Sequence, residues 1–243
     1  MFTRIATVGA ISAGLTLQLN RRTASCNSAN NYIFDTRGIP ANLPTSHITD
    51  VSSPLHLVGV GMRRKYLIIA EFDVYLVGVA LSPEALKKAT EWANAPEDSR
   101  KPLSTYVLAA DKPAPNAKPS IPRGVKAGVM IHMVRGATKS QFVDAFREAF
   151  QGISDEHFHS FQPLLEDCMG DKGMQAKDEM GFFFMNDGTL VLAKNGQVKG
   201  SLKIDDINVR LLDIYSDPKR SVSKELSTSV AQNLPKVLAQ YGK

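Results

Sequence analysis

Apolar runs rich in β-branched and aromatic residues predict strands early in the chain. The stretch LHLVGVGMRRKYLIIAEFDVYLVGVALS, residues 55–82, begins as a short apolar strand at residues 55–60. We expect the chain to turn at Gly59 and Gly61, to pass through a basic cluster, and to continue as a long strand over residues 66–81. This arrangement would place an arginine where two strands meet, beside an apolar wall.

Three later segments also have the pattern of strands. They are residues 104–110, 125–134 and 181–204. The last is predicted to contain a hairpin, because Asn195-Gly196 accepts positive φ at both turn positions. Residues 111–124 hold four prolines and are predicted to form a loop. The total is six or seven strands, largely antiparallel.

Apolar positions at helical spacing predict helices between and after these strands. The predicted helices cover residues 83–95, 138–150, 154–168, 205–215 and 223–241. Ser82 followed by Pro83 is a typical helix start, and Asp205 is expected to cap the fourth helix. Pro235 lies within the last helix and should kink or split it. Together these elements predict an α+β fold, a large antiparallel sheet with helices packed on one face.

The first part of the chain has the composition of a targeting leader. Residues 1–31 contain three arginines, many Ser, Thr and Ala, and no Asp or Glu. This composition is typical of an organelle transit peptide. We expect a mitochondrial presequence as the first choice and a plastid or secretory leader as the second. The alternative is a disordered tail without an address. Residues 32–53 are expected to form a linker leading into an edge strand, followed by the folded domain at residues 54–243.

Composition limits the remaining classes of function. The 243 residues are 43% hydrophobic, which suits one domain with a sizeable core. The net charge of +5 includes the arginines of residues 1–31, and the mildly basic remainder argues against a nucleic-acid partner. Cys26 and Cys168 lack metal-ligand spacing, so we expect neither a disulfide framework nor a bound metal. We expect no membrane span, which needs roughly 20 apolar residues.

Four stretches, in this order, resemble the chalcone isomerase superfamily. They are GVGMR with VYLVGVAL, VMIHMVRGATKSQFVDAFREAF, FFFMNDGTLVLAKNGQVKGS and LLDIYSDPKRSVSKEL. The resemblance extends from about residue 51 to the C-terminus. The superfamily contains chalcone isomerases, isomerase-like proteins without the activity, and fatty-acid-binding members. The resemblance implies a chalcone isomerase-like open-faced β-sandwich.

The resemblance also implies where chemistry would occur. Ring closure by a chalcone isomerase needs a cation near the attacking phenolate and hydrogen-bond donors at the substrate carbonyl. The residue that looks like the family's cation is Arg63. The positions that look like the family's other polar residues are Ala70, Phe142, Ala149 and Ile214. None of these four side chains has a hydroxyl or an amide, so we expect no isomerase activity. A register shift by one residue would offer Glu71 or Gln141, and neither reproduces the family's Thr or Tyr.

The remaining polar groups favour a ligand with an anionic head and an apolar body. Arg63 can hold a carboxylate through two parallel hydrogen bonds, and Tyr75 on the long strand could add another. A fatty acid or similar amphiphile fits these groups, as in the family's fatty-acid-binding members, and no cofactor is expected. Three alternatives remain. They are a purely structural Arg63, an active isomerase on another substrate, and a haem-linked or structural organelle protein.

Other residues offer less specific chemistry. His132 alternates with apolar residues in a predicted strand, which is typical of a core histidine. His157 and His159 could bind a metal only with a third ligand from elsewhere. Cys168 has no activating partner in the sequence, so a nucleophilic role is not expected.

Overall fold

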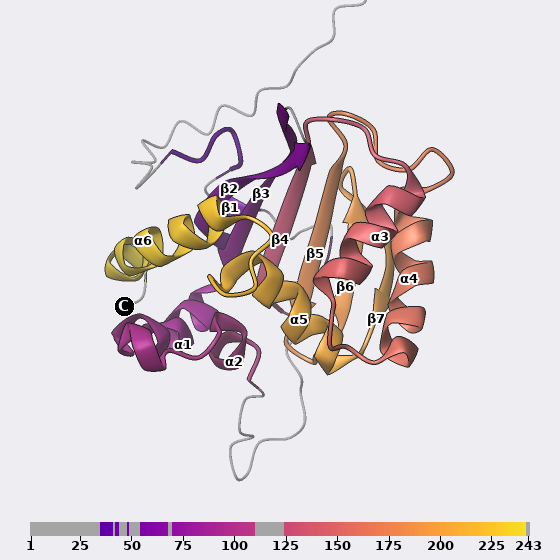
Figure 1. Cartoon of the computed structure of the whole chain (residues 1–243). Coiled ribbons are helices and arrows are strands. Elements are labelled where there is room, and N and C mark those ends of the chain that lie inside the picture. Colours follow the sequence, from indigo (N-terminus) through magenta and orange to yellow (C-terminus); the bar gives the residue numbers. More distant parts are fainter. Residues whose placement is uncertain are drawn as a thin grey trace, which may run out of the picture. The chain divides into compact units, whose positions relative to one another are not determined.

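Seven antiparallel strands form one sheet in the residues that the computed structural model describes (Figure 1). These residues are 35–40, 42–43, 48, 54–67, 70–109 and 124–241. The strands are β1 (Asn42–Leu43), β2 (Leu55–Leu67), β3 (Ala70–Leu81), β4 (Val125–Met133), β5 (Glu179–Met185), β6 (Leu190–Lys194) and β7 (Gln197–Leu202). They lie side by side in sequence order. The predicted leader at residues 1–31 and nearly all of the predicted loop at residues 111–124 lie outside the described residues.

Helices cover one face of this sheet. They are α1 (Pro83–Asn94), the 3-10 turn η1 (Glu97–Ser99), α2 (Leu103–Val107), α3 (Lys139–Ala149), α4 (Asp155–Met169), α5 (Asp205–Ser216) and α6 (Lys224–Tyr241). α6 packs against β2, α1 against β3 and β4, and α4 against β6 and β7. Apolar side chains from these helices share one buried core with Val129 and Phe182 of the sheet. This arrangement confirms the predicted α+β fold.

Gly59 and Gly61 lie inside β2, so the turn predicted at these glycines is wrong. A Cβ atom on Gly59 would lie 2.5 Å from Val230 Cγ2, and one on Gly61 would overlap the backbone nitrogen of Leu226. The two glycines therefore allow α6 to cross β2 at close range, because any larger side chain would separate the two elements. β2 instead continues to Leu67 and pairs antiparallel with β3, which begins at Ala70.

The strand predicted at residues 104–110 is also wrong, because this segment begins within helix α2. Thr105, Tyr106 and Val107 favour strands by local preference. In the folded protein α2 contacts α1 and α5, and its Leu103 and Val107 side chains are fully buried. Packing against α1 and α5 therefore makes this short segment helical, although its residues prefer strands.

Two local predictions are confirmed. The backbone N–H of Ala85 donates to the Ser82 hydroxyl at 3.1 Å, so Ser82 caps α1 as expected. Asn195 and Gly196 have φ values of 51° and 78°, as a tight hairpin turn between β6 and β7 requires.

Two details of the last helices differ from prediction. Ile204, without a side-chain hydrogen bond, occupies the N-cap of α5, and Asp205 lies in the first turn. An acidic side chain there still interacts favourably with the helix dipole. Pro235 does not split α6, which continues as one helix. Burial of Leu234 and Val237 beside the proline stabilises the helix against the lost hydrogen bond.

The other face of the sheet carries a second, smaller apolar cluster. Leu55, Leu57 and Phe183 are buried on this outer face, and Ile39 and Leu43 pack against it. β1 pairs with the first residues of β2 and forms one edge of the sheet. The sheet therefore has apolar groups on both faces.

Candidate functional site

Arg63 lies in β2 on the helix-covered face of the sheet. Residues two apart in a strand share a face, so Arg63 shares the face of Gly59 and Gly61, which contact α6. Its Cα partner on β3 is Tyr75. The half-buried Arg63 side chain therefore lies in the layer between sheet and helices, next to Tyr75.

The connection between α5 and α6 contacts Arg63 directly. Arg63 Nη1 donates to the Val222 carbonyl at 2.6 Å. The Ser223 hydroxyl donates to the Met62 carbonyl at 2.9 Å, so the connection is attached to β2 at two successive residues. One N–H of the guanidinium thus has a structural partner, and a guanidinium has four more to donate.

Two tyrosines complete this site. Tyr215 of α5 is 1% exposed and shares a hydrogen bond with Tyr75. Burial raises the pKa of both phenols, that of Tyr215 well above its usual range. Their hydrogen bond raises the pKa of Tyr215 and lowers that of Tyr75. The positive charge of Arg63 lowers the pKa of both. Both phenols are therefore neutral near pH 7, and the Tyr75 hydroxyl can donate to a ligand.

Arg63 and its neighbour Arg64 differ in their charge partners. Arg64 Nε lies 3.0 Å from Asp73, and Arg64 Nη1 lies 3.4 Å from Glu225. No carboxylate within the described part of the chain lies at ion-pair distance from Arg63. A half-buried guanidinium without a counter-charge favours the approach of an anion. Among the described residues, carboxylates thus neutralise Arg64 and leave the charge of Arg63 uncompensated.

A buried carboxylate holds the helices beside this site together. Asp213 of α5 is 1% exposed and accepts hydrogen bonds from the Ser104 hydroxyl of α2 and, at 3.2 Å, from Arg220 Nη1. Burial raises the pKa of Asp213, whereas the Ser104 hydrogen bond and the charge of Arg220 lower it. This cluster anchors the connection whose Val222 carbonyl binds Arg63.

The structure brings Tyr75 to Arg63 but leaves Ala70 apart from them. Ala70 pairs with Leu67 at the tip of the β2–β3 hairpin, five positions before Tyr75 in the same strand. At roughly 3.3 Å per residue, this separation is far beyond the contact range of an alanine side chain. The residue of the long strand that faces Arg63 is therefore Tyr75.

Phe142 and Ala149, also inferred from the resemblance, lie on α3. Phe142 is buried, with its ring centroid 5.3 Å from that of Phe146. Phe146 in turn lies 5.7 Å from Phe182 of β5. These rings form part of the main core, and Ala149 packs at its margin.

Ile214 and its neighbour Tyr215 on α5 are both buried. The side chain that brings a polar group to Tyr75 and Arg63 is that of Tyr215. Tyr215 was not among the site residues inferred from the sequence. A one-residue change of register rotates a helical position by about 100°, so it exchanges one face of the helix for another. The LLDIYSDP motif did contain the signal, because it places a tyrosine within one residue of the inferred position.

Two other candidate reactive side chains, Cys168 and His157, are enclosed or paired. Cys168 is buried, and burial raises the pKa of its thiol to about 11, so the thiol is neutral near pH 7. His157 Nδ1 lies 3.2 Å from Asp206. Among the described residues, no group of three or more His, Cys, Asp or Glu side chains could hold a metal ion. No helix in that same part of the chain is long and apolar enough to cross a membrane.

The sheet and its helices have the chalcone isomerase-like fold. The chain is similar to a solved structure of the fatty-acid binding protein AtFAP1 of Arabidopsis thaliana, with a TM-score of 0.59 and 21% sequence identity. The similarity covers 82% of this chain and 93% of that one. No protein-family model and no curated protein sequence matches the chain. The fold implied by the sequence resemblance is therefore confirmed by structure.

Proposed function

We propose that the protein binds a fatty acid or similar anionic amphiphile, with the ligand carboxylate at Arg63. One observation carries the proposal: the half-buried Arg63 guanidinium binds a carbonyl and, among the described residues, has no carboxylate partner. A carboxylate can accept two parallel, charge-assisted hydrogen bonds from a guanidinium. The neutral hydroxyl of Tyr75 supplies a further donor beside it.

Two further observations support a ligand of this kind. Apolar side chains fill the layer between sheet and helices, and each methylene that a ligand buries among them contributes about 0.8 kcal/mol. AtFAP1, which shares the fold, is a fatty-acid binding protein. Fold alone does not determine function, so the proposal depends on Arg63.

Lipid retained through native purification tests the proposal. Mass spectrometry of released lipid should find long-chain carboxylates bound to the wild-type protein. Arg63→Ala should weaken binding by about tenfold or more, since a hydrogen bond to a charged group contributes about 1.5–3 kcal/mol. An empty wild-type protein, or equal retention by Arg63→Ala, would contradict the proposal.

Arg64→Ala is the matched control, because it removes an adjacent arginine that already has carboxylate partners. This variant should retain lipid as the wild type does. Since Arg63 also binds the Val222 carbonyl, Tyr75→Phe provides a second variant that keeps the guanidinium and its structural bond. Tyr75→Phe should weaken retention by a smaller factor than Arg63→Ala.

Isomerase activity is the second candidate function, favoured by the two hydroxyls at the site. Tyr75 and Tyr215 share a hydrogen bond beside Arg63, and donors of this kind can polarise a substrate carbonyl. A chalcone cyclisation assay tests this function. Turnover by the wild type that is lost in both Arg63→Ala and Tyr75→Phe would support it, and no turnover would favour the carrier function.

We also propose that residues 1–31 direct the protein to an organelle, with the mitochondrion first and a plastid second. The basis is the sequence alone, which has three arginines and no acidic residue there. A fusion of residues 1–31 to a fluorescent protein should concentrate in that organelle. Diffuse fluorescence in the cytosol would contradict the proposed targeting role of residues 1–31.

A further inference from the structure

The connection between α5 and α6 folds back onto α5 at two points. Arg220 Nη1 donates to Asp213 Oδ2 at 3.2 Å, and the Val222 backbone N–H donates to the Ile214 carbonyl at 2.9 Å. The two acceptors are adjacent residues of α5. Since the Val222 carbonyl accepts from Arg63 Nη1, these attachments determine where the partner of the Arg63 guanidinium lies.

The ion pair between Asp213 and Arg220 joins a buried carboxylate to a half-exposed guanidinium. Asp213 is enclosed between α5 and α2, where its other oxygen accepts from the Ser104 hydroxyl. The Arg220 side chain is 48% exposed, so its replacement removes the pair without opening a cavity in the core. Loss of Arg220 would therefore release the connection at this point and leave the core packing in place.

The orientation of Arg63 matters because a carboxylate accepts two parallel hydrogen bonds from a guanidinium. An arginine side chain has several rotatable bonds, and ordering it when a ligand binds lowers the affinity. The bond from Arg63 Nη1 to the Val222 carbonyl orders the guanidinium before the ligand arrives. A fixed Val222 carbonyl should therefore strengthen the binding of an anionic head group.

We propose that Asp213 and Arg220 are positioning residues for Arg63. Their ion pair holds the Val222 carbonyl in place, and this carbonyl orients the remaining N–H groups of the Arg63 guanidinium for a carboxylate. The inference rests on the proposed function of Arg63. It adds that the preference for an anionic head group over a neutral one depends on the α5–α6 connection, through residues that act on Arg63 and not on the ligand.

Calorimetric titration of the full chain with decanoate and with decanol measures this preference. The two probes have chains of equal length, so the ratio of their affinities reports on the head group. Arg220→Ala should reduce the preference for decanoate by about threefold or more, because Arg63 becomes less ordered. The affinity for decanol should stay within about twofold of the wild-type value, whereas a general loss of structure would weaken both ligands alike.

Two matched variants separate positioning from a general effect of charge. Arg220→Lys keeps a cation that can pair with Asp213, so it should restore most of the preference. Lys219→Ala removes the same charge from the adjacent, exposed residue of the connection and should leave the preference unchanged. Thermal denaturation establishes that each variant is folded. Should Arg220→Ala not fold, Arg220→Met takes its place with the same expected result, because it keeps an alkyl stem without the charge.

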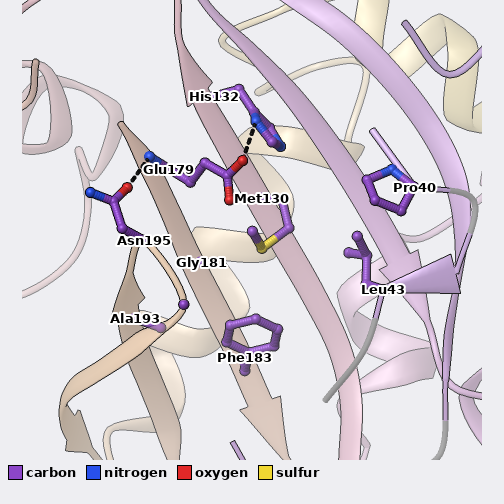
Figure 2. Close-up of a pocket in the computed structure, with 10 residues that line it drawn as sticks. Pro40, Leu43, Met130, His132, Glu179, Gly181, Phe183, Ala193 and Asn195 are labelled. Atoms are coloured by element: carbon purple, nitrogen blue, oxygen red, sulfur yellow. Dashed lines mark hydrogen bonds and ion pairs between the residues drawn. The ribbon is translucent and has the colours of Figure 1, made fainter. Parts of the chain in front are cut away.

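The outer face of the sheet provides a control for effects on the sheet itself. A cavity of about 290 Å³ lies on this face, and Glu179 lines it, with Oε1 3.1 Å from His132 Nδ1 (Figure 2). Glu179→Gln changes a charged side chain on the face opposite Arg63. This variant should therefore keep the wild-type preference for decanoate.

Two results would overturn the inference and leave the fatty-acid proposal standing. They are a full wild-type preference in Arg220→Ala, and an equal loss of preference in Arg220→Ala and Lys219→Ala. A wild type without any preference for decanoate would contradict the fatty-acid proposal itself, and the inference with it.

Discussion

At the scale of single residues, Gly59 and Gly61 determine how closely α6 approaches β2. Gly61→Ala should lower the free energy of unfolding by about 3 kcal/mol, because its Cβ would overlap the backbone of Leu226. Chemical denaturation measures this change. Gly136→Ala is the matched control, since its Cβ would be 3.4 Å from the Met174 carbonyl oxygen, an ordinary contact. The control should change stability by less than about 1 kcal/mol, and an equal loss in both variants would contradict the account.

His56 makes stability depend on pH. Its ring stacks on Tyr241, with centroids 4.1 Å apart, and its Nδ1 lies 2.9 Å from Asn42 Oδ1. Burial lowers the pKa of His56, so below about pH 6.5 the unfolded chain binds a proton more readily than the folded one. The stability contribution of His56 is therefore present above that pH and is lost as pH falls through the lower, folded-state value.

Denaturation at several pH values should show this loss in the wild type. His56→Gln should reduce the slope of stability against pH in the acid range by up to about one proton per molecule. His159→Gln alters an exposed histidine and should leave the slope unchanged. The same slope in wild type and His56→Gln would contradict the role of burial.

Contacts between residues that are remote in sequence, and the exact register of a helix, could not be predicted for every site residue. Arg63 and Tyr75 were both identified from the sequence, and they face each other across β2 and β3. Tyr215 was missed in favour of Ile214, because the sequence resemblance does not fix helix register to one residue. The two glycines of β2 were interpreted as a turn, because their contact with α6 is remote in sequence.

At the scale of elements, α2 is held by a buried polar contact to α5. Ser104→Ala should destabilise the protein by about 1–3 kcal/mol, since it removes a partner of the buried Asp213 carboxylate. Ser99→Ala is the control, because its hydroxyl bonds the Pro96 carbonyl at an exposed turn. Thermal denaturation should show a lower midpoint only for Ser104→Ala. An unchanged midpoint in that variant would show that Asp213 is not an anchor.

Helices and strands with several turns or alternations of apolar residues could be predicted from the sequence, whereas the five-residue helix α2 could not. The helices at α1, α3, α4, α5 and α6 and the strands β4 to β7 follow from periodicity and turn residues. α2 has five residues, too few for a period to emerge, and contacts with α1 and α5 decide its conformation. The β2–β3 reversal was misplaced because apolar residues continue through it without a turn signal.

At the scale of the whole folded unit, the sheet separates Arg63 from the cavity beside Glu179. Arg63 lies on the helix side, and the cavity beside Glu179 lies on the outer face. Sites without shared contacts should act independently. The effects of Arg63→Ala and Glu179→Gln on unfolding free energy should therefore add within about 0.5 kcal/mol in the double variant. A larger deviation, measured by denaturation, would indicate coupling through the sheet.

The most direct test of the central claim compares two ligands that differ only in the head group. Calorimetric titration with a long-chain fatty acid and with the alcohol of equal chain length separates the contribution of Arg63 from that of the apolar chain. The wild type and Arg64→Ala should prefer the carboxylate by about tenfold or more, and Arg63→Ala should lose this preference while still binding the alcohol. A wild type without the preference, or an Arg63→Ala variant that keeps it, would contradict the assignment of Arg63 as the carboxylate-binding residue.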